Sequence, residues 1–227
     1  MNGESYEIEI KSLLGSRENA EKLKERMRTH DPNLRELGRH RQLNHYFVGG
    51  NLASLHVAVA GHISTQGAGN FLSVIPRAKD FSLRTRDADG KIILVLKIAV
   101  DDTTSANGTG RLEFETPLPG FTLDQLDQLI LSCGFSYQAK WSREREEYEC
   151  DSAHVTIDRN AGYGYLAEFE IVASDANEIE GTKARLRDLM RAVGAEELDA
   201  ARLERMFAFY NTHWAEYYGT EKVFTIA

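Results

Sequence analysis

The segment Glu7-Ile8-Glu9-Ile10-Lys11 alternates charged and aliphatic side chains without a break. Successive side chains of a β-strand point to opposite faces of the sheet. As a strand, this segment would therefore place two carboxylates and one ammonium on one face and two isoleucines on the other. An apolar face needs an apolar neighbour, whereas a face with both charge signs needs solvent or a ligand. The segment predicts a β-strand with one strongly charged face.

Charged residues two positions apart recur in later segments of the chain. Arg84 and Arg86 share one face of their predicted strand, and Glu168 and Glu170 share one face of another. For any single strand, a solvated outer face is the simpler interpretation of such a pattern. The residues that this alternation places on the charged faces are Glu7, Glu9, Lys11, Arg84, Arg86, Lys97, Arg111, Glu113, Glu115, Arg143, Arg145, Asp158, Glu168 and Glu170.

The rest of the chain predicts a succession of short strands, with helices between and after them. The pair Asp89-Gly90 separates two alternating segments and is a strong hairpin signal. The predicted strands cover residues 6–14, 39–48, 81–86, 91–100, 111–115, 137–150, 154–158 and 165–172. The predicted helices cover residues 16–27, 51–60, 122–130, 176–193 and 196–218. The glycine-rich residues 61–70 are predicted to form a loop.

This order of elements favours an antiparallel barrel over a parallel sheet with helical crossovers. If the apolar faces of the strands filled the barrel, the apolar stripes of the helices would have nothing to cover. In the reverse arrangement, the charged faces line a water-filled tunnel. The apolar faces of the strands then point outward and pack against the apolar stripes of the helices. A barrel of about eight strands can hold a ligand inside. We therefore predict an α+β fold, with a closed eight-stranded antiparallel β-barrel over residues 1–175 and helices over residues 176–227 packed on it.

Composition limits the class of partner. The 227 residues carry a formal net charge of −8 at pH 7, which argues against a protein that grips nucleic acid through a basic surface. No apolar run approaches the roughly 20 residues that span a bilayer, and the first residues show no secretory signal. The two cysteines, Cys133 and Cys150, indicate neither a disulfide framework nor a zinc site. We expect a cytoplasmic protein with no nucleic-acid and no membrane partner.

The charged faces together indicate a ligand. Burying many paired charges rarely stabilises a protein relative to apolar packing, so a ligand that uses both signs is the more economical explanation. Carboxylates suit the hard cations Mg²⁺ and Mn²⁺, and the fork of N–H donors on arginine suits phosphate oxygens. A polyphosphate in complex with a divalent metal needs both kinds of group.

Charged and aromatic motifs follow one another in a specific order. They are Glu7-Ile8-Glu9-Ile10-Lys11, Gln42-Leu43-Asn44-His45-Tyr46-Phe47, Leu83-Arg84-Thr85-Arg86, Lys97, Arg111-Leu112-Glu113-Phe114-Glu115, Arg143-Glu144-Arg145-Glu146-Glu147-Tyr148, Asp158 and Glu168-Phe169-Glu170. This ordered set resembles the CYTH superfamily of triphosphate tunnel metalloenzymes, with inorganic triphosphatases, thiamine triphosphatases and class IV adenylyl cyclases as relatives. The first motif alone would be a weak signal, whereas the set, which spans residues 6 to about 172, is specific.

The resemblance implies an enzyme that uses Mg²⁺ or Mn²⁺ as cofactor and a small-molecule triphosphate as substrate. The metal ligands that it implies are Glu7, Glu9, Glu168 and Glu170, with Asp158 beside them and one of the pair Glu113 and Glu115 at a second metal site. The residues that it implies for holding the triphosphate are Lys11, Arg84, Arg86, Lys97, Arg111, Arg143 and Arg145. Lys11 and Glu9 are the implied catalytic residues, and Lys11 would orient or deprotonate the attacking water.

The sequence departs from the family pattern at two places. Tyr-Phe is usually followed by Asp-Thr, but here Val48-Gly49-Gly50 follows. Many hydrolytic members carry a lysine two positions after the aspartate of the seventh strand, where this chain has Asn160. The neighbouring Arg159 is predicted to face the other way. These departures concern the choice of substrate more than the fold.

Three functions are compatible with the sequence. Hydrolysis of a linear triphosphate, inorganic or organic, is favoured. Cyclisation of ATP to cyclic AMP would need a base-binding pocket at the rim, and a non-catalytic polyphosphate-binding or nucleotide-binding module would have little use for so many carboxylates. The apolar stripe over residues 203–217 is more simply a helix packed on the barrel than the seam of a homodimer.

Overall fold

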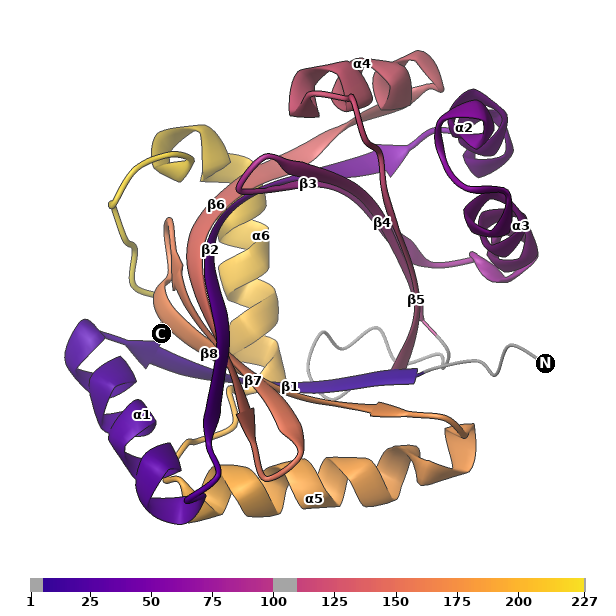
Figure 1. The fold of residues 1–227 in the computed structure, drawn as a ribbon. Coiled ribbons are helices and arrows are strands. Elements are labelled where there is room, and N and C mark those ends of the chain that lie inside the picture. Colours follow the sequence, from indigo (N-terminus) through magenta and orange to yellow (C-terminus); the bar gives the residue numbers. More distant parts are fainter. Residues whose placement is uncertain (1–5, 100–109, 227) are drawn as a thin grey trace.

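The computed structural model describes residues 6–99 and 110–226 (Figure 1). Within these ranges the strands are β1 (Tyr6–Gly15), β2 (Arg35–Gly49), β3 (Phe81–Ala88), β4 (Lys91–Ala99), β5 (Gly110–Pro117), β6 (Phe135–Cys150), β7 (Ala153–Asn160) and β8 (Gly164–Ala173). The α-helices are α1 (Arg17–His30), α2 (Leu52–Val59), α3 (Thr65–Val74), α4 (Leu123–Ser132), α5 (Ile179–Ala192) and α6 (Ala200–Tyr217).

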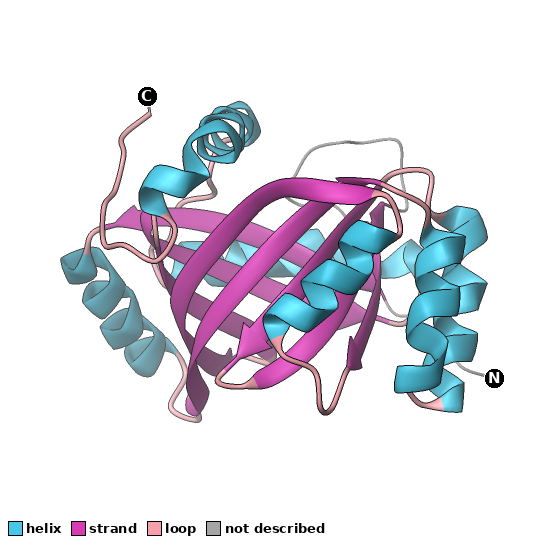
Figure 2. Cartoon of the chain, turned by 90° about the horizontal axis from the view of Figure 1, so that it is seen from above, coloured by secondary structure: helices cyan, strands magenta, loops and turns pink. Residues whose placement is uncertain are grey.

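The eight strands form a ring in which each strand pairs with two antiparallel neighbours. Their order around the ring is β1-β5-β4-β3-β2-β6-β7-β8, and β8 returns to β1. Figure 1 looks into this ring, and Figure 2 shows the tilted strands with helices on several sides. The β1–β5 pairing is short and runs from Tyr6↔Leu112 to Ile8↔Gly110. The predicted α+β class, with eight antiparallel strands in a ring, is confirmed.

The hairpin of β3 and β4 turns where the sequence predicts. Asp89 and Gly90 both adopt positive φ angles, of 50° and 88°, as a two-residue turn that matches the twist of the flanking strands requires. The backbone N–H of Gly90 donates to the Asp87 carboxylate at 2.6 Å. This turn sets the register of β3 and thereby places Arg84 and Arg86 side by side on the inner face of the ring.

The apolar faces of the strands point outward and are covered by helices in two groups. Helices α1 and α5 pack over β1, β7 and β8, where Ile8 and Ile10 are fully buried against a cluster that includes Met27 and Leu186. Helices α2, α3 and α4 pack over β3, β4 and β5 in a second cluster. Hydrophobic burial therefore holds the ring from outside, which leaves its interior for polar groups.

Helix α6 packs at one end of the ring through aromatic side chains. Tyr210 is fully buried and stacks on Trp141 of β6, with ring centroids 3.7 Å apart. Its hydroxyl donates to the carbonyl of Lys140 at 2.9 Å. The predicted stripe of α6 faces this cluster, which contains Leu203, Phe207, Tyr210, Trp214 and Tyr217. The stripe thus packs on the strands of its own chain.

The loop predicted over residues 61–70 is wrong in part, because residues 65–70 belong to helix α3. The Ser64 hydroxyl caps this helix by accepting a hydrogen bond from the backbone N–H of Gly67 at 3.0 Å. Phe71 is fully buried and stacks on Phe114 of β5 with centroids 4.9 Å apart. A Cβ atom on Gly67 would lie 3.3 Å from the Thr116 hydroxyl, so glycine allows close packing on β5. This tertiary contact outweighs the low helix propensity of glycine.

Both cysteines are free, with Cys150 buried in β6 and Cys133 partly buried after α4. Burial raises the pKa of the Cys150 thiol to about 11, so its reactive thiolate is scarce at neutral pH. In the described ranges, every helix is too short or too polar to cross a membrane. A cytoplasmic location stays a prediction.

Truncation of Tyr210 tests whether its ring anchors α6 to the strands. Tyr210→Ala removes a buried, stacked ring, so we expect the free energy of unfolding to fall by about 3–5 kcal/mol. Tyr210→Phe removes only the hydrogen bond to Lys140 and should cost about 1 kcal/mol. Equilibrium urea unfolding of both variants measures the difference. Equal losses for the two variants would contradict an anchoring role for the ring.

Candidate functional site

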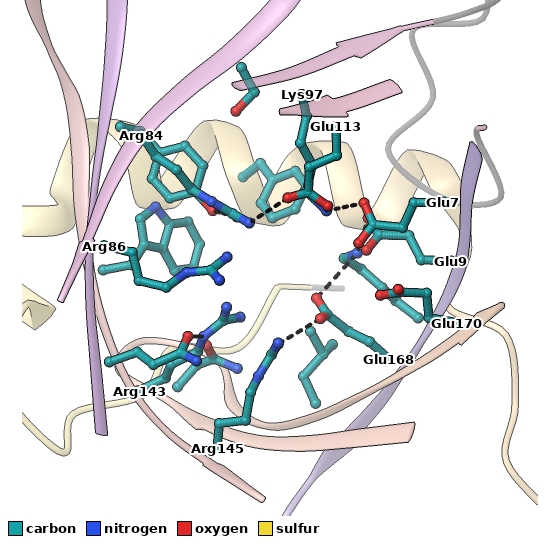
Figure 3. A pocket seen from close by; sticks show the side chains of 18 of the residues that line it. Glu7, Glu9, Arg84, Arg86, Lys97, Glu113, Arg143, Arg145, Glu168 and Glu170 are labelled. Carbon is teal, nitrogen blue, oxygen red and sulfur yellow. Dashed lines mark hydrogen bonds and ion pairs between the residues drawn. The ribbon is translucent and has the colours of Figure 1, made fainter. Parts of the chain in front are cut away.

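A cavity of about 680 Å³ occupies the interior of the ring. Inward side chains of all eight strands line it, and Phe207 and Asn211 of α6 line it at one end. Figure 3 shows that the charged side chains from different strands converge on its centre. The predicted inversion, with charges inside and apolar faces outside, therefore describes the arrangement of this ring.

Three carboxylates form the centre of an acidic wall. Glu7 and Glu9 lie on β1, and Glu170 lies directly opposite Glu9 on β8. One oxygen of each group lies within 4.8 Å of an oxygen of the other two. Burial and the adjacent Glu7 raise the pKa of Glu170 to about 9, because a second buried negative charge so close is unfavourable.

The chemistry of this carboxylate trio fits a divalent metal ion. Its donors are all oxygens, which suit Mg²⁺ or Mn²⁺ rather than a thiolate-seeking metal. The mutual repulsion that raises the pKa of Glu170 is what a bound cation would relieve. Glu7, Glu9 and Glu170 are therefore the residues of the described chain best placed to hold the metal that the sequence predicts.

Four guanidinium groups form the opposite wall. Arg84 and Arg86 project from β3, and Arg143 and Arg145 project from β6, facing the acids across the cavity (Figure 3). Burial and the charge of Arg84 lower the pKa of Arg86 to about 10. Burial and the charge of Arg145 likewise lower the pKa of Arg143. Groups that repel one another in this way form a site that an anion would stabilise.

Ion pairs with two lysines surround the carboxylate trio. The ammonium of Lys11 lies 2.7 Å from Glu9 and 3.2 Å from Glu168. The ammonium of Lys97 pairs with Glu7 and lies 3.6 Å from Glu113. Burial raises the pKa of Glu113 to about 7 despite the nearby Lys97. These pairs hold the long lysine side chains in place around the carboxylate trio.

Asp158 and Glu168 do not join the carboxylate trio. Asp158 is fully buried and accepts hydrogen bonds from Arg145 at 2.6 and 2.7 Å and from Arg143 at 2.8 Å. Glu168 lies between Lys11 and Arg145, at 3.2 and 2.7 Å. Both carboxylates therefore hold cationic side chains in position here, and a metal-binding role for them stays a prediction.

The structure brings most of the predicted site residues together. Asp158 lies behind the arginines, and the side chain of Arg111, at the start of β5, lies outside the described residues. The predicted residues that line the cavity are Glu7, Glu9, Lys11, Arg84, Arg86, Lys97, Glu113, Glu115, Arg143, Arg145, Glu168 and Glu170. Which of them bind metal or phosphate stays a prediction.

Further residues complete the lining, among them the acids Asp80 and Glu147 and several uncharged or aromatic residues that the charge pattern did not select. The uncharged or aromatic residues include Gln42, Tyr46, Trp141, Tyr163 and Phe207. The alternation along β2 contained a signal for the first two, since Gln42 and Tyr46 are an even number of positions apart and each is followed by an apolar residue, Leu43 and Phe47. No comparable signal marks Tyr163, which lies in the turn between β7 and β8.

The two departures from the family pattern both lie at the cavity. Val48 and Asn160 are among its lining residues. Arg159 points to the outer surface, where it pairs with Glu221 and lies 3.4 Å from Glu144. Arg159 therefore does not replace the missing lysine at Asn160, and the charged neighbour of Asn160 at the cavity is its cross-strand partner Arg143.

The fold and the cavity define a protein with an eight-stranded antiparallel ring and a charged interior. Comparison of the sequence with known families identifies its family. Residues 74–203, more than half of the chain, match the CYTH domain. The protein therefore belongs to the CYTH family, and the predicted membership is confirmed. No curated protein matches the sequence.

Solved structures share the fold. A conserved hypothetical protein from Pyrococcus furiosus is 19% identical, with 84% of this chain and 92% of that chain covered and a TM-score of 0.61. A protein from Pyrococcus horikoshii is 18% identical, with 86% and 96% covered and a TM-score of 0.60. A Vibrio parahaemolyticus protein, suggested to be an adenylate cyclase, is 15% identical, with 91% and 99% covered and a TM-score of 0.59. At these identities the likeness concerns the fold alone.

Replacing Glu170 tests the electrostatics of the carboxylate trio in metal-free protein. The pKa of Glu170 is about 9 in the fold, against an ordinary value of 4.5. Between these values the native state keeps a proton that the unfolded chain has released, so the free energy of unfolding falls as pH rises. Glu170→Gln keeps an N–H donor beside Glu7 and removes the titration. We expect this fall to become smaller, and Tm at high pH to rise by about 2–4 °C for each kcal/mol gained.

Thermal unfolding between about pH 5 and pH 9 in a buffer with chelator measures this effect. Glu144→Gln is the matched control, because Glu144 lies on the exposed outer face of β6. A pH dependence of Glu170→Gln that is identical to that of the parent protein would contradict the raised pKa.

Proposed function

We propose that this protein is a divalent-metal-dependent triphosphatase that hydrolyses a linear triphosphate inside the ring. The observation that carries the proposal is the opposition of a carboxylate trio and four arginines across one cavity. Neither wall alone is specific, since acids without cations bind many metals and arginines without acids bind many anions. Together they fit a polyphosphate in complex with a divalent metal ion.

The arginines would hold the phosphate groups. Arg84, Arg86 and Arg143 present planar groups of N–H donors toward the cavity, and such groups can bind phosphate oxygens through two bonds at once. Because they come from two different strands, they can contact successive phosphates of an extended chain. Fixed positive charges of this kind stabilise the charge that develops during phosphoryl transfer.

The carboxylates would hold the cofactor. When bound, Mg²⁺ or Mn²⁺ supplies positive charge to phosphate oxygens and lowers the pKa of a water molecule. In hydrolysis, the water oxygen forms a bond to the terminal phosphorus, and the bond from that phosphorus to the bridging oxygen breaks. Glu7, Glu9 and Glu170 would fix where this water approaches, because they define one side of the cavity.

Lys11 is placed to orient groups rather than to remove a proton. Its ammonium donates to Glu9 at 2.7 Å and lies 3.2 Å from Glu168. An ammonium held by two carboxylates is a donor with no lone pair to accept a proton. Of the two roles expected for Lys11, this geometry favours positioning of the phosphate or of the attacking water.

Cyclisation of ATP is the second candidate function. It is favoured by the aromatic end of the cavity, where Trp141, Tyr163 and Phe207 line the wall beside α6. A flat purine ring can stack on such side chains. Here the ribose 3′-oxygen would attack the α-phosphorus and pyrophosphate would leave. A binding module without catalysis is the third candidate function, in which the carboxylate trio would only bind a metal ion.

One assay separates these functions. Purified protein with Mg²⁺ or Mn²⁺ is incubated with tripolyphosphate, ATP or thiamine triphosphate, and phosphate, pyrophosphate and cyclic AMP are measured. We expect release of phosphate from at least one substrate. Production of cyclic AMP with pyrophosphate would support the cyclase instead, and no turnover of any substrate would contradict both enzymatic functions.

Glu9→Gln tests the role of the carboxylate trio in catalysis. Loss of one charged oxygen ligand should lower kcat/KM by about 100-fold or more, since even residues that merely support metal ligands cost 10–100-fold when replaced. Glu144→Gln, on the outer face of β6, should retain full activity. Undiminished activity of Glu9→Gln would show that the metal is held elsewhere.

A further inference from the structure

Three inward residues of β2 each accept a hydrogen bond from a different arginine. Arg143 Nε donates to Gln42 Oε1 at 2.9 Å, and Arg86 Nε donates to Asn44 Oδ1 at 3.2 Å. Arg84 Nη1 donates to the Tyr46 hydroxyl at 2.8 Å. The three acceptors are successive residues on one face of a single strand, and their partners come from the strands on both sides of it.

The strand register explains this arrangement. Tyr46 lies directly opposite Arg84 and Asn44 directly opposite Arg86 in the β2–β3 pairing. Gln42 lies opposite Arg143 in the β2–β6 pairing. Residues that face one another across an antiparallel pair are close enough for their side chains to interact. Strand β2 therefore meets one arginine at each of the three inward positions 42, 44 and 46.

We propose that Gln42, Asn44 and Tyr46 are positioning residues, which orient three guanidinium groups toward a bound triphosphate without neutralising their charge. This inference rests on the proposed function, because it assigns the arginines to the phosphate chain. All three acceptors are uncharged oxygens. A carboxylate at the same place would accept the same hydrogen bond, but it would also compete with phosphate for the positive charge.

The atoms that are used support this role. Nε is the guanidinium nitrogen nearest the backbone, so an acceptor there fixes the plane of the group while both terminal nitrogens lie beyond it. Arg86 and Arg143 are held in this way by Asn44 and Gln42. Two planar groups with fixed orientation lose little further entropy when they bind an anion.

Arg145 shows the contrasting arrangement. It donates to Asp158 at 2.6 and 2.7 Å and to Glu168 at 2.7 Å, and thus to two carboxylates. The carboxylates near the other three arginines are fewer or more distant. Glu113 lies 3.9 Å from Arg84, Glu115 lies 3.3 Å from Arg86, and Arg143 shares Asp158 with Arg145. Strand β2 thus serves the three arginines whose charge is least compensated.

The side chain of Asn44 has one unfavourable feature, an unsatisfied buried nitrogen, and the proposed positioning role explains it. Its amide nitrogen is buried without a hydrogen-bond partner among the described residues, which is normally unfavourable. Arginine Nε can only donate, so the oxygen of Asn44 must face Arg86 and its NH₂ group must turn away. Rotating the amide would not satisfy the nitrogen either, because its N–H groups would then face the N–H of the guanidinium, which cannot accept a hydrogen bond. The fold keeps the unsatisfied nitrogen and thereby keeps the acceptor on Arg86.

Asn44→Asp separates a positioning role from a structural one. The substitution preserves shape and acceptor but adds a carboxylate beside Arg86. We expect the ligand-free protein to become as stable as its parent or more stable, because the new charge relieves repulsion among the arginines. Binding of tripolyphosphate should weaken by about tenfold or more, which corresponds to about 1.4 kcal/mol. A residue needed only for folding would instead lower stability and leave the affinity of the folded fraction unchanged.

Isothermal titration calorimetry with tripolyphosphate in a chelator-containing buffer measures the affinity, and thermal unfolding measures the stability. Gln42→Glu should behave as Asn44→Asp does, and it serves as the second variant if one fails to fold. Asn70→Asp, on the exposed surface of α3, adds the same charge away from the cavity and should bind as the parent protein does.

The outcomes distinguish the two proposals. If the parent protein binds tripolyphosphate and Asn44→Asp and Gln42→Glu bind equally well, the proposed role of these residues as neutral positioning groups is wrong while the proposed function stands. If the parent protein fails to bind tripolyphosphate both with chelator and with Mg²⁺, the proposed function fails and the inference fails with it. Weaker binding with unchanged or higher stability supports the inference.

Discussion

Like charges are held close together on both sides of the cavity, and the rest of the structure depends on that constraint. Three carboxylates lie within 4.8 Å of one another on one side, and four guanidinium groups gather on the other. Burial strengthens the repulsion within each group. Burial, together with this crowding, raises the pKa of Glu170 and lowers the pKa of Arg86. The repulsion within both groups is relieved by a ligand that carries a cation to one wall and an anion to the other.

A polar interior requires that the stability of the ring come from elsewhere. The outward faces of the strands supply it, because two large apolar clusters lie between the ring and the helices. An aromatic cluster around Trp141 and Tyr210 adds the contact with α6 at one end. Apolar packing against the helices therefore stabilises this ring, as side chains packed in the interior stabilise smaller barrels. The interior can then hold polar groups.

The alternation within single strands predicted most of the charged residues that line the cavity, because the side-chain period of a strand is two, but it missed Asp80 and Glu147. It could not predict which acids meet, since that depends on register between strands far apart in sequence. Glu9 faces Glu170 across β1 and β8, whereas Asp158 faces Arg145 across β7 and β6. Some of the acids thus form the carboxylate trio, and others accept hydrogen bonds from arginines. The alternation pattern of the sequence does not distinguish these two groups. Helix α3 was missed for a related reason, because a distant contact of Phe71 stabilises it.

The most direct test of the account is a crystal structure with Mn²⁺ and a non-hydrolysable triphosphate analogue, with the anomalous signal of manganese recorded. We expect a manganese peak among the oxygens of Glu7, Glu9 and Glu170, and a phosphate chain that contacts Arg84, Arg86 and Arg143. A manganese peak away from these carboxylates, or an analogue bound on the outer surface of the ring, would contradict this expectation.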